Sequence, residues 1–146
     1  MQKDLLESLS IKMSDKKIRG GSLIARALRD KGIENVFTLS GGFCNPALEG
    51  LMECQIDVIN CPHEQIAGHI ADGHTRITRK PAVCLVGPEG FANAVPSMME
   101  AWGERSPVIF ITGSSSLRRQ RSGGFKENDD VKIDEPVSNT NLRSHE

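Results

Sequence analysis

The chain has 146 residues, 38% of them hydrophobic, with a formal net charge of -1 at pH 7 and a pI near 6.4. This length suits one compact domain with its own core, and the near-neutral charge gives no sign of the basic face typical of nucleic-acid binding. No segment has the unbroken apolar length of a membrane span or the apolar core of a secretory signal, so we expect a soluble cytoplasmic protein without a nucleic-acid or membrane partner.

The first half of the chain predicts helices and strands in alternation. An apolar face at helical spacing predicts a helix over residues 22–31. Residues 35–39 follow as a short buried strand, which ends in the glycine turn Ser40-Gly41-Gly42. A helix over about 46–52 comes next, and residues 56–60 form the second strand.

The second half continues the same alternation. It predicts a long helix over about 63–79, a strand over 82–86, a turn at Pro88-Glu89-Gly90, a helix over about 91–105 and a strand over 108–112. Strands that alternate with helices through short connections are typical of an α/β fold. We therefore predict a doubly wound parallel sheet with helices on both faces.

The pattern divides the chain into three parts. Residues 1–19 form a polar leader, and residues 20–113 hold all the predicted strands in one α/β domain. Apolar periodicity stops at Ser114, where the composition turns to Ser, Arg, Gly, Lys and Asp. Residues 114–146 are therefore expected to be an extended arm and tail that is disordered or orders only on a partner.

Glu64 is the most informative candidate for a functional residue. It lies at the junction between the second predicted strand and the long helix, where the carboxyl ends of parallel strands form a ligand crevice. A carboxyl group sheltered from water there is suited to share a proton with a cofactor nitrogen. The alternative is an exposed acidic residue that is favoured at a helix start by the helix dipole. Glu64 and the turns at Gly41-Gly42 and Pro88-Glu89-Gly90 lie at the carboxyl ends of successive predicted strands, which converge on one edge of a parallel sheet and so favour a shared site.

Neither the cysteines nor the histidines predict a metal site. The four cysteines lie in or beside apolar segments without a Cys-x-x-Cys pair, so we expect reduced core thiols. They are Cys44, Cys54, Cys61 and Cys84. His63, His69 and His74 do not have the spacing of three or four that would put them on one helical face. Capping or surface roles are the expected ones.

Several linked motifs carry a family resemblance. They are Val36 to Gly42 with Pro46 after it, His63-Glu64-Gln65, Ala71 to Arg76 with Lys80-Pro81, Asn93, and Pro107 to Gly113. In this order and spacing, residues from about 20 to 137 resemble the N-terminal pyrimidine-binding domain of thiamine-diphosphate-dependent enzymes of the acetolactate synthase and pyruvate oxidase type. The resemblance implies the thiamine-diphosphate-binding fold.

The resemblance also implies a role for each candidate residue. Glu64 would be the catalytic carboxylate that activates thiamine diphosphate by hydrogen bonding to its aminopyrimidine ring. Five further residues would contact the cofactor beside it. They are Leu39, Ser40, Gly41, Gly90 and Asn93. Two positions depart from the family pattern. Pro88-Glu89-Gly90 occupies the place where the family usually has Gly-Pro-Gly, which puts Glu89 in that turn, and Lys126 replaces a Gln that approaches the substrate.

A second domain is implied in the same way. Related enzymes carry a diphosphate-binding domain whose Gly-Asp-Gly sequence holds magnesium and the diphosphate, and this chain contains no Gly-Asp-Gly. The chain is therefore expected to be inactive without a diphosphate-binding domain or subunit, and to work in a homo- or hetero-oligomer. Some relatives use FAD, which binds mainly outside this domain, so its use is undetermined here.

Three interpretations of the missing half stay open. The chain is part of a longer enzyme, or a natural small subunit with a separate diphosphate-binding partner, or a non-catalytic regulatory or binding domain that keeps the fold. The first two imply acetolactate synthase-like carboligation or decarboxylation of 2-oxo acids or related carbonyl compounds. The substrate itself is not readable from these residues, because fold alone does not assign function.

Overall fold

The computed structural model describes residues 18–116, 118 and 121–138. The strands are β1 (Asn35–Thr38), β2 (Asp57–Asn60), β3 (Ala82–Val86) and β4 (Val108–Thr112). The α-helices are α2 (Gly20–Asp30), α3 (Asn45–Glu53), α4 (Glu64–Thr78), α5 (Pro88–Gly103) and α6 (Asp130–Asp134). Two short 3-10 helices complete the set, η1 (Gly42–Cys44) and η3 (Glu135–Val137).

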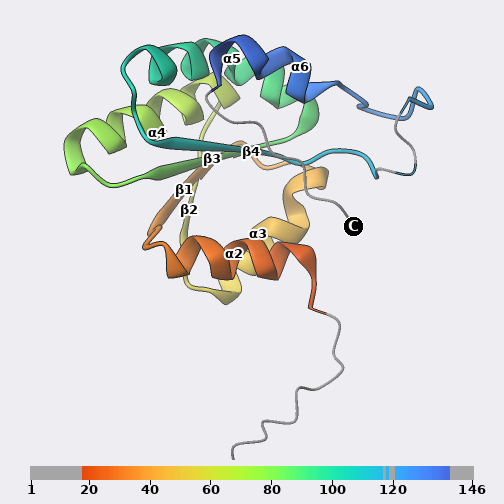
Figure 1. The fold of residues 1–146 in the computed structure, drawn as a ribbon. Helices are drawn as coiled ribbons and strands as arrows, with labels where there is room; N and C mark the ends of the chain where they lie inside the picture. Colours follow the sequence, from red (N-terminus) through yellow and green to blue (C-terminus); the bar gives the residue numbers. More distant parts are fainter. Residues whose placement is uncertain (1–17, 117, 119–120, 139–146) are drawn as a thin grey trace, which may run out of the picture.

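The four strands form one parallel sheet in the order β2-β1-β3-β4. In Figure 1, α2 and α3 lie on one side of the sheet and α4 and α5 on the other. The predicted α/β architecture, a parallel sheet covered on both faces, is therefore confirmed. Within the described residues, no helix is long and apolar enough to cross a membrane.

The central strand β3 divides two apolar cores. All five of its residues are buried, and alternate side chains point to opposite faces of the sheet. Val83 and Leu85 join the core beneath α2 and α3, whereas Cys84 and Val86 join the core beneath α4 and α5. This explains why a short apolar run without alternation was a strong strand signal.

The helices of each pair approach each other closely at glycines. A Cβ atom added at Gly50 of α3 would lie 2.5 Å from the carbonyl oxygen of Gly21 in α2. A Cβ atom added at Gly68 of α4 would lie 1.9 Å from Ser97 Oγ in α5. Any larger side chain at these two positions would force the paired helices apart.

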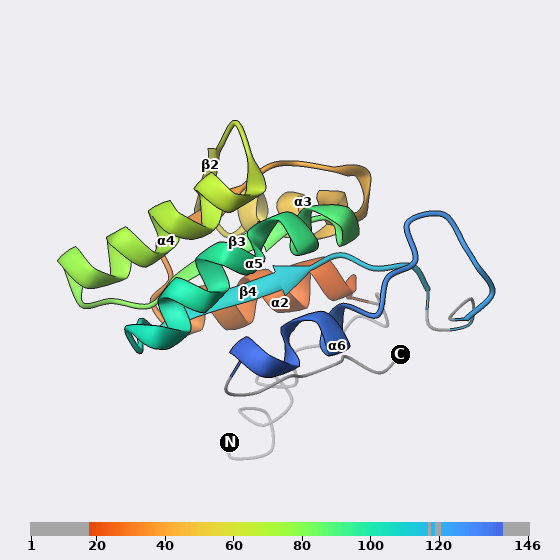
Figure 2. The ribbon, with the colours of Figure 1, turned by 90° about the horizontal axis from the view of Figure 1, so that it is seen from above.

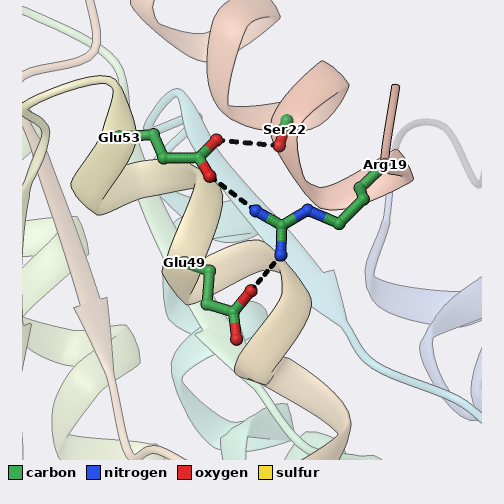
Figure 3. A network of polar contacts seen from close by, with 4 residues as sticks. All are labelled: Arg19, Ser22, Glu49 and Glu53. Atoms are coloured by element: carbon green, nitrogen blue, oxygen red, sulfur yellow. Dashed lines mark hydrogen bonds and ion pairs between the residues drawn. The ribbon is translucent and has the colours of Figure 1, made fainter. Parts of the chain in front are cut away.

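A polar network fastens the start of α2 to α3 (Figure 3). Arg19 forms ion pairs with Glu49 and, at 2.5 Å, with Glu53. The Ser22 hydroxyl donates a hydrogen bond to the same Glu53 carboxylate at 2.9 Å. The ion pairs are about half exposed, so they orient α2 on α3 more than they stabilise the fold.

Two segments differ from the sequence prediction. Pro88, Glu89 and Gly90 form the first turn of α5 instead of a separate turn before it, with Pro88 at the favoured first helical position. The expected arm also contains structure, because α6 and η3 form within it and pack against α5. Val137 contacts the core beneath α5. Residues 139–146 of the predicted tail lie outside the described residues.

Candidate functional site

The ends of three strands meet at the carboxyl edge of the sheet. Strand β1 lies between β2 and β3, and Thr38 at its end is in register with both Asn60 and Leu85. Thr38 is fully buried, and its hydroxyl donates to the Leu85 carbonyl at 2.6 Å. The connections that follow these three strands therefore gather at one edge, as predicted for a ligand crevice.

Glu64 is the first residue of α4 and reaches this edge half-buried. His63 caps the helix before it, because its Nδ1 accepts a hydrogen bond from the Gln65 amide at 3.2 Å. The cap leaves the Glu64 side chain free to turn toward α5. The local sequence thus fixes the start of α4 and the position of the carboxylate together.

The carboxylate of Glu64 is held between α4 and α5. Asn93 Nδ2 donates a hydrogen bond to Glu64 Oε2 at 3.1 Å. Gly90 lies directly against the other oxygen, since a Cβ atom added there would be 2.6 Å from Oε1. The structure therefore brings together three of the predicted site residues in direct contact, and Gly90 is needed for this approach.

Leu39, Ser40 and Gly41 share this edge through the pairing of β1 with β2. The Ser40 amide donates to Asn60 Oδ1 at 3.3 Å, which holds the chain as it leaves β1. Gly41 is extended, with φ -150° and ψ 161°, a conformation open to any residue. A Cβ atom added there would meet nothing within 4 Å. Neither backbone strain nor packing in the described structure explains the glycine.

The family follows from a comparison of the sequence. Residues 18–133 match the family described as "Thiamine pyrophosphate enzyme, N-terminal TPP binding domain". The chain belongs to this family. The predicted resemblance is therefore confirmed, and the carboxyl edge described above is the edge at which Glu64 was expected.

Curated proteins of similar sequence have names consistent with the thiamine pyrophosphate enzyme family. The chain is 36% identical over 122 residues to an acetolactate synthase large subunit of Mycobacterium tuberculosis, covering 83% of this chain and 22% of the relative. It is 33% identical over 136 residues to 2-hydroxyacyl-CoA lyase 2 of Mus musculus, covering 91% of this chain and 21% of the relative. The chain thus spans about a fifth of the length of the curated relatives it matches.

Solved structures support the fold. A thiamin diphosphate-dependent enzyme from Mycobacterium smegmatis superposes with a TM-score of 0.72 at 22% identity, over 86% of this chain and 24% of that one. A thiamine diphosphate-dependent 4-hydroxybenzoylformate decarboxylase from Rhodococcus jostii gives 0.75 at 21% identity, over 82% and 23%. The thiamine-diphosphate-binding fold is therefore shared by all three.

The two positions that depart from the family pattern face each other. Glu89, in the first turn of α5, forms an ion pair with Lys126. The hydrogen bond from Lys126 holds the pKa of the Glu89 carboxyl below its ordinary value. The sequence alone gave no sign of this contact, because the two residues are 37 positions apart.

The core beneath α4 and α5 contains two of the cysteines. Cys61 and Cys84 are buried with Phe91 in the core beneath α4 and α5, and all four cysteines are free thiols. Burial raises the pKa of the Cys84 thiol to about 12 and also raises the pKa of Cys61. Both thiols therefore remain neutral at physiological pH.

Two of the histidines, His63 and His74, make structural contacts. His63 caps α4, and the His74 ring packs at 5.6 Å from the Phe37 ring. In the part of the chain that the structure describes, no three His, Cys, Asp or Glu residues cluster in a way that could hold a metal ion.

Two surface hollows lie away from Glu64. One of about 340 Å³ is lined by Arg76, Arg79 and Arg105 near the ends of α4 and α5. The other, of about 430 Å³, lies beside β2 and includes Phe37 and Ile70. Neither is lined by Glu64, Gly90 or Asn93.

Asn60 is the residue that sequence reasoning missed at this edge. It ends a predicted strand, and its side chain supports the chain at Ser40 from the neighbouring strand. A polar residue at the last position of a strand, in an edge where ligands bind, was the available signal.

Proposed function

We propose that this domain holds the aminopyrimidine ring of thiamine diphosphate at the carboxyl edge of its sheet, with Glu64 as the carboxylate that shares a proton with a ring nitrogen. The observation that carries the proposal is the placement of Glu64 between α4 and α5, bonded to Asn93 and in contact with Gly90. Membership of the thiamine pyrophosphate enzyme family supports the choice of cofactor.

The residues around Glu64 fit this task. A carboxyl group has two oxygens, so Asn93 can bond to Oε2 while the other oxygen accepts from a protonated ring nitrogen when the group is ionised, or donates to the ring nitrogen when the group is protonated. Gly90 lets the carboxylate lie close to α5. The open space at Gly41 leaves room for a planar ring, with backbone groups of Leu39 and Ser40 beside it.

When bound, thiamine diphosphate supplies a carbanion next to its thiazolium nitrogen, which is the chemistry that carbon–carbon bond cleavage beside a carbonyl requires. Glu64 contributes by holding a proton at the ring nitrogen, from its half-buried position at the start of α4. Asn93 contributes orientation, because it restricts the rotation of the carboxylate.

We further propose an enzyme that acts on 2-oxo acids or related carbonyl compounds, by carboligation or decarboxylation. The relatives named acetolactate synthase and 2-hydroxyacyl-CoA lyase support this class. Magnesium and the diphosphate would be held by another domain or subunit. Ile66, Ile70 and Ile77 are exposed along α4, and an apolar surface of this kind favours assembly into an oligomer.

The test is Glu64→Gln, measured as turnover of a 2-oxo acid after assembly with a diphosphate-binding domain, thiamine diphosphate and magnesium. Gln keeps the size of the side chain but cannot exchange the proton, so turnover should fall by about 10²–10⁴-fold. Glu34→Gln is the matched control, because Glu34 is exposed at the opposite edge of the sheet and pairs with Lys80. Its turnover should equal that of the unchanged protein.

The unfolding midpoint of both variants should match the unchanged protein, which separates lost chemistry from lost folding. Full turnover by Glu64→Gln would contradict the proposal. Such a result would mean that the catalytic assignment of Glu64 is wrong, whereas an assembly of the unchanged chain without any turnover would favour the non-catalytic regulatory or binding domain.

A further inference from the structure

A hollow lined by three arginines lies at the amino edge of the sheet, opposite the edge that carries Glu64. Its volume is about 340 Å³, at the lower end of the range for small-molecule sites. Figure 2 shows the ends of α4 and α5 on the left, on the side where β4 begins. Helix α4 has 15 residues, so its two ends are roughly 22 Å apart. A small ligand in the hollow would therefore be separate from a cofactor at Glu64.

The order of the chain places two of these arginines side by side. Arg79 stands three residues before β3 and Arg105 three residues before β4, and each is followed by one residue and then a proline. The two strands are paired, with Ala82 opposite Val108, and the Ala82 amide donates to the Pro107 carbonyl at 3.3 Å. Neighbouring strands are about 4.8 Å apart, so equivalent positions just before them are close neighbours.

The backbone of these turns does not require arginine. Arg79 has a φ of +59° and Arg105 a φ of +55°, the left-handed conformation in which glycine is favoured after a helix. Gln55 adopts the same conformation after α3, with a φ of +56°. Such a turn therefore accepts a side chain without a positive charge, and the local conformation explains neither arginine.

The chain does not compensate the charges of Arg79 and Arg105. The third arginine of the hollow, Arg76, pairs with Asp72 at 2.7 Å and lies 3.8 Å from Glu104, the carboxylate in the lining. Among the described residues, the guanidinium groups of Arg79 and Arg105 have neither a hydrogen bond nor an ion pair. Like charges at neighbouring positions repel each other, so an anion between them would be bound favourably.

We propose that Arg79 and Arg105 bind a phosphate group carried by a small molecule. Each guanidinium presents a planar fork of N–H donors that matches two oxygens of a phosphate. A phosphate monoester has a charge of about −1.5 to −2 at pH 7 and three terminal oxygens, enough for both forks. A single carboxylate has one charge and two oxygens, which one arginine satisfies. The proposal is independent of the function proposed for Glu64, because the two sites lie at opposite edges of the sheet.

The experiment titrates the full chain with glycerol 3-phosphate, inorganic phosphate and succinate by isothermal titration calorimetry. Ionic strength is held constant with chloride, because any salt screens exposed charges. Glycerol 3-phosphate should bind saturably with a Kd on the order of 1 mM, as expected for a few charge-assisted hydrogen bonds. Inorganic phosphate should bind about threefold more weakly, because it fills less of the hollow. The backbone amide chemical shifts that change should be those of residues 75–79 and 104–106.

Replacing either arginine by glycine separates binding from folding. Arg79→Gly and Arg105→Gly should each weaken glycerol 3-phosphate binding about tenfold, equivalent to one charge-assisted hydrogen bond. Without ligand, each should raise the unfolding midpoint, because glycine is favoured in the left-handed conformation and one of two like charges is removed. Gln55→Gly is the matched control, since it relieves the same conformation without changing a charge. Its unfolding midpoint should also rise, with unchanged binding.

Several outcomes would overturn the proposal. Unchanged binding in both arginine variants, or chemical-shift changes confined to residues 88–93, would place the phosphate elsewhere. A lower unfolding midpoint in Arg79→Gly and Arg105→Gly would mean that the arginines serve the helix ends, where a positive charge is favourable, and not a ligand. Succinate binding as tight as that of glycerol 3-phosphate would assign the hollow to dicarboxylates. Heats no larger than those of added chloride would mean that the arginines are only screened.

Discussion

Gly68→Ala is predicted to destabilise the chain, because α4 and α5 touch at this residue. The added Cβ atom would lie 1.9 Å from Ser97 Oγ and 2.7 Å from Ser97 Cβ. The Ser97 side chain has no room to yield. It is fully buried, and its hydroxyl donates to the Ala94 carbonyl at 2.6 Å.

The magnitude follows from three effects. Forcing an extra methyl group into a packed contact costs about 1–3 kcal/mol. Loss of the Ser97 hydrogen bond costs about 1 kcal/mol more. Replacing glycine by alanine inside a helix stabilises the folded state by up to about 1 kcal/mol. The last two effects roughly cancel, so the free energy of unfolding should fall by about 1–3 kcal/mol.

Gly73→Ala provides the matched control in the same helix. A Cβ atom at Gly73 meets nothing within 4 Å, so only the helix preference acts, and stability should rise by about 0.5–1 kcal/mol. Urea denaturation of both variants, followed by circular dichroism, measures the difference. Equal stability of the two variants would show that α4 and α5 are not in contact at Gly68, and the reasoning would be refuted.

Three other outcomes are expected. Burial opposes the charge of Asp72, but hydrogen bonds from Arg76 and Ser106 outweigh it and hold the pKa of Asp72 below 3.8. The ionised carboxylate therefore stabilises the folded state at pH values above 3.8, and this contribution is lost as the pH falls through the lower folded pKa. In Asp72→Asn, the free energy of unfolding, measured by urea denaturation, should therefore decrease less steeply as the pH is lowered. Because burial raises the pKa of Cys84 to about 12, Ellman's reagent should label Cys84 only after unfolding, and rapid labelling of the folded chain would contradict its burial. Gly90→Ala should push the flexible Glu64 side chain aside and lower cofactor-dependent turnover by about 10²-fold at an unchanged unfolding midpoint; undiminished turnover would remove Gly90 from the site.

The strands were predictable because apolar runs end at prolines and glycines. The bounds of β3 and β4 agree with the prediction, and those of β1 and β2 differ by one residue. Pro88 to Gly90 was predicted wrongly, because Pro-Glu-Gly has the composition of a turn while proline is equally favoured in the first turn of a helix. Helix α6 has only five residues, too few to show periodicity, and it depends on packing against α5.

The site was predictable only where topology decides it. Glu64 follows β2, and Gly90 and Asn93 follow β3, so all three lie at the carboxyl edge of one parallel sheet, and their approach could be expected from the order of the elements. The contact between Glu89 and Lys126 could not, because it depends on the path of a segment that has no periodic pattern. The contact of Asn60 with Ser40 was not predicted for a different reason, because the sequence indicates only that Asn60 is the last residue of a strand.

The close contact at Gly68 also sets the geometry of the proposed site. Glu64 lies four residues before Gly68 on α4, and Asn93 lies four residues before Ser97 on α5, so each pair shares a helical face. The spacing of α4 and α5 at Gly68 and Ser97 thus determines whether Asn93 can reach Glu64 one turn away, where the bond is 3.1 Å. Gly68→Ala should therefore reduce cofactor-dependent turnover even under conditions in which the chain stays folded, whereas Gly73→Ala should not. Loss of stability without loss of turnover would mean that the carboxylate is positioned by its own helix start and not by the helix pair.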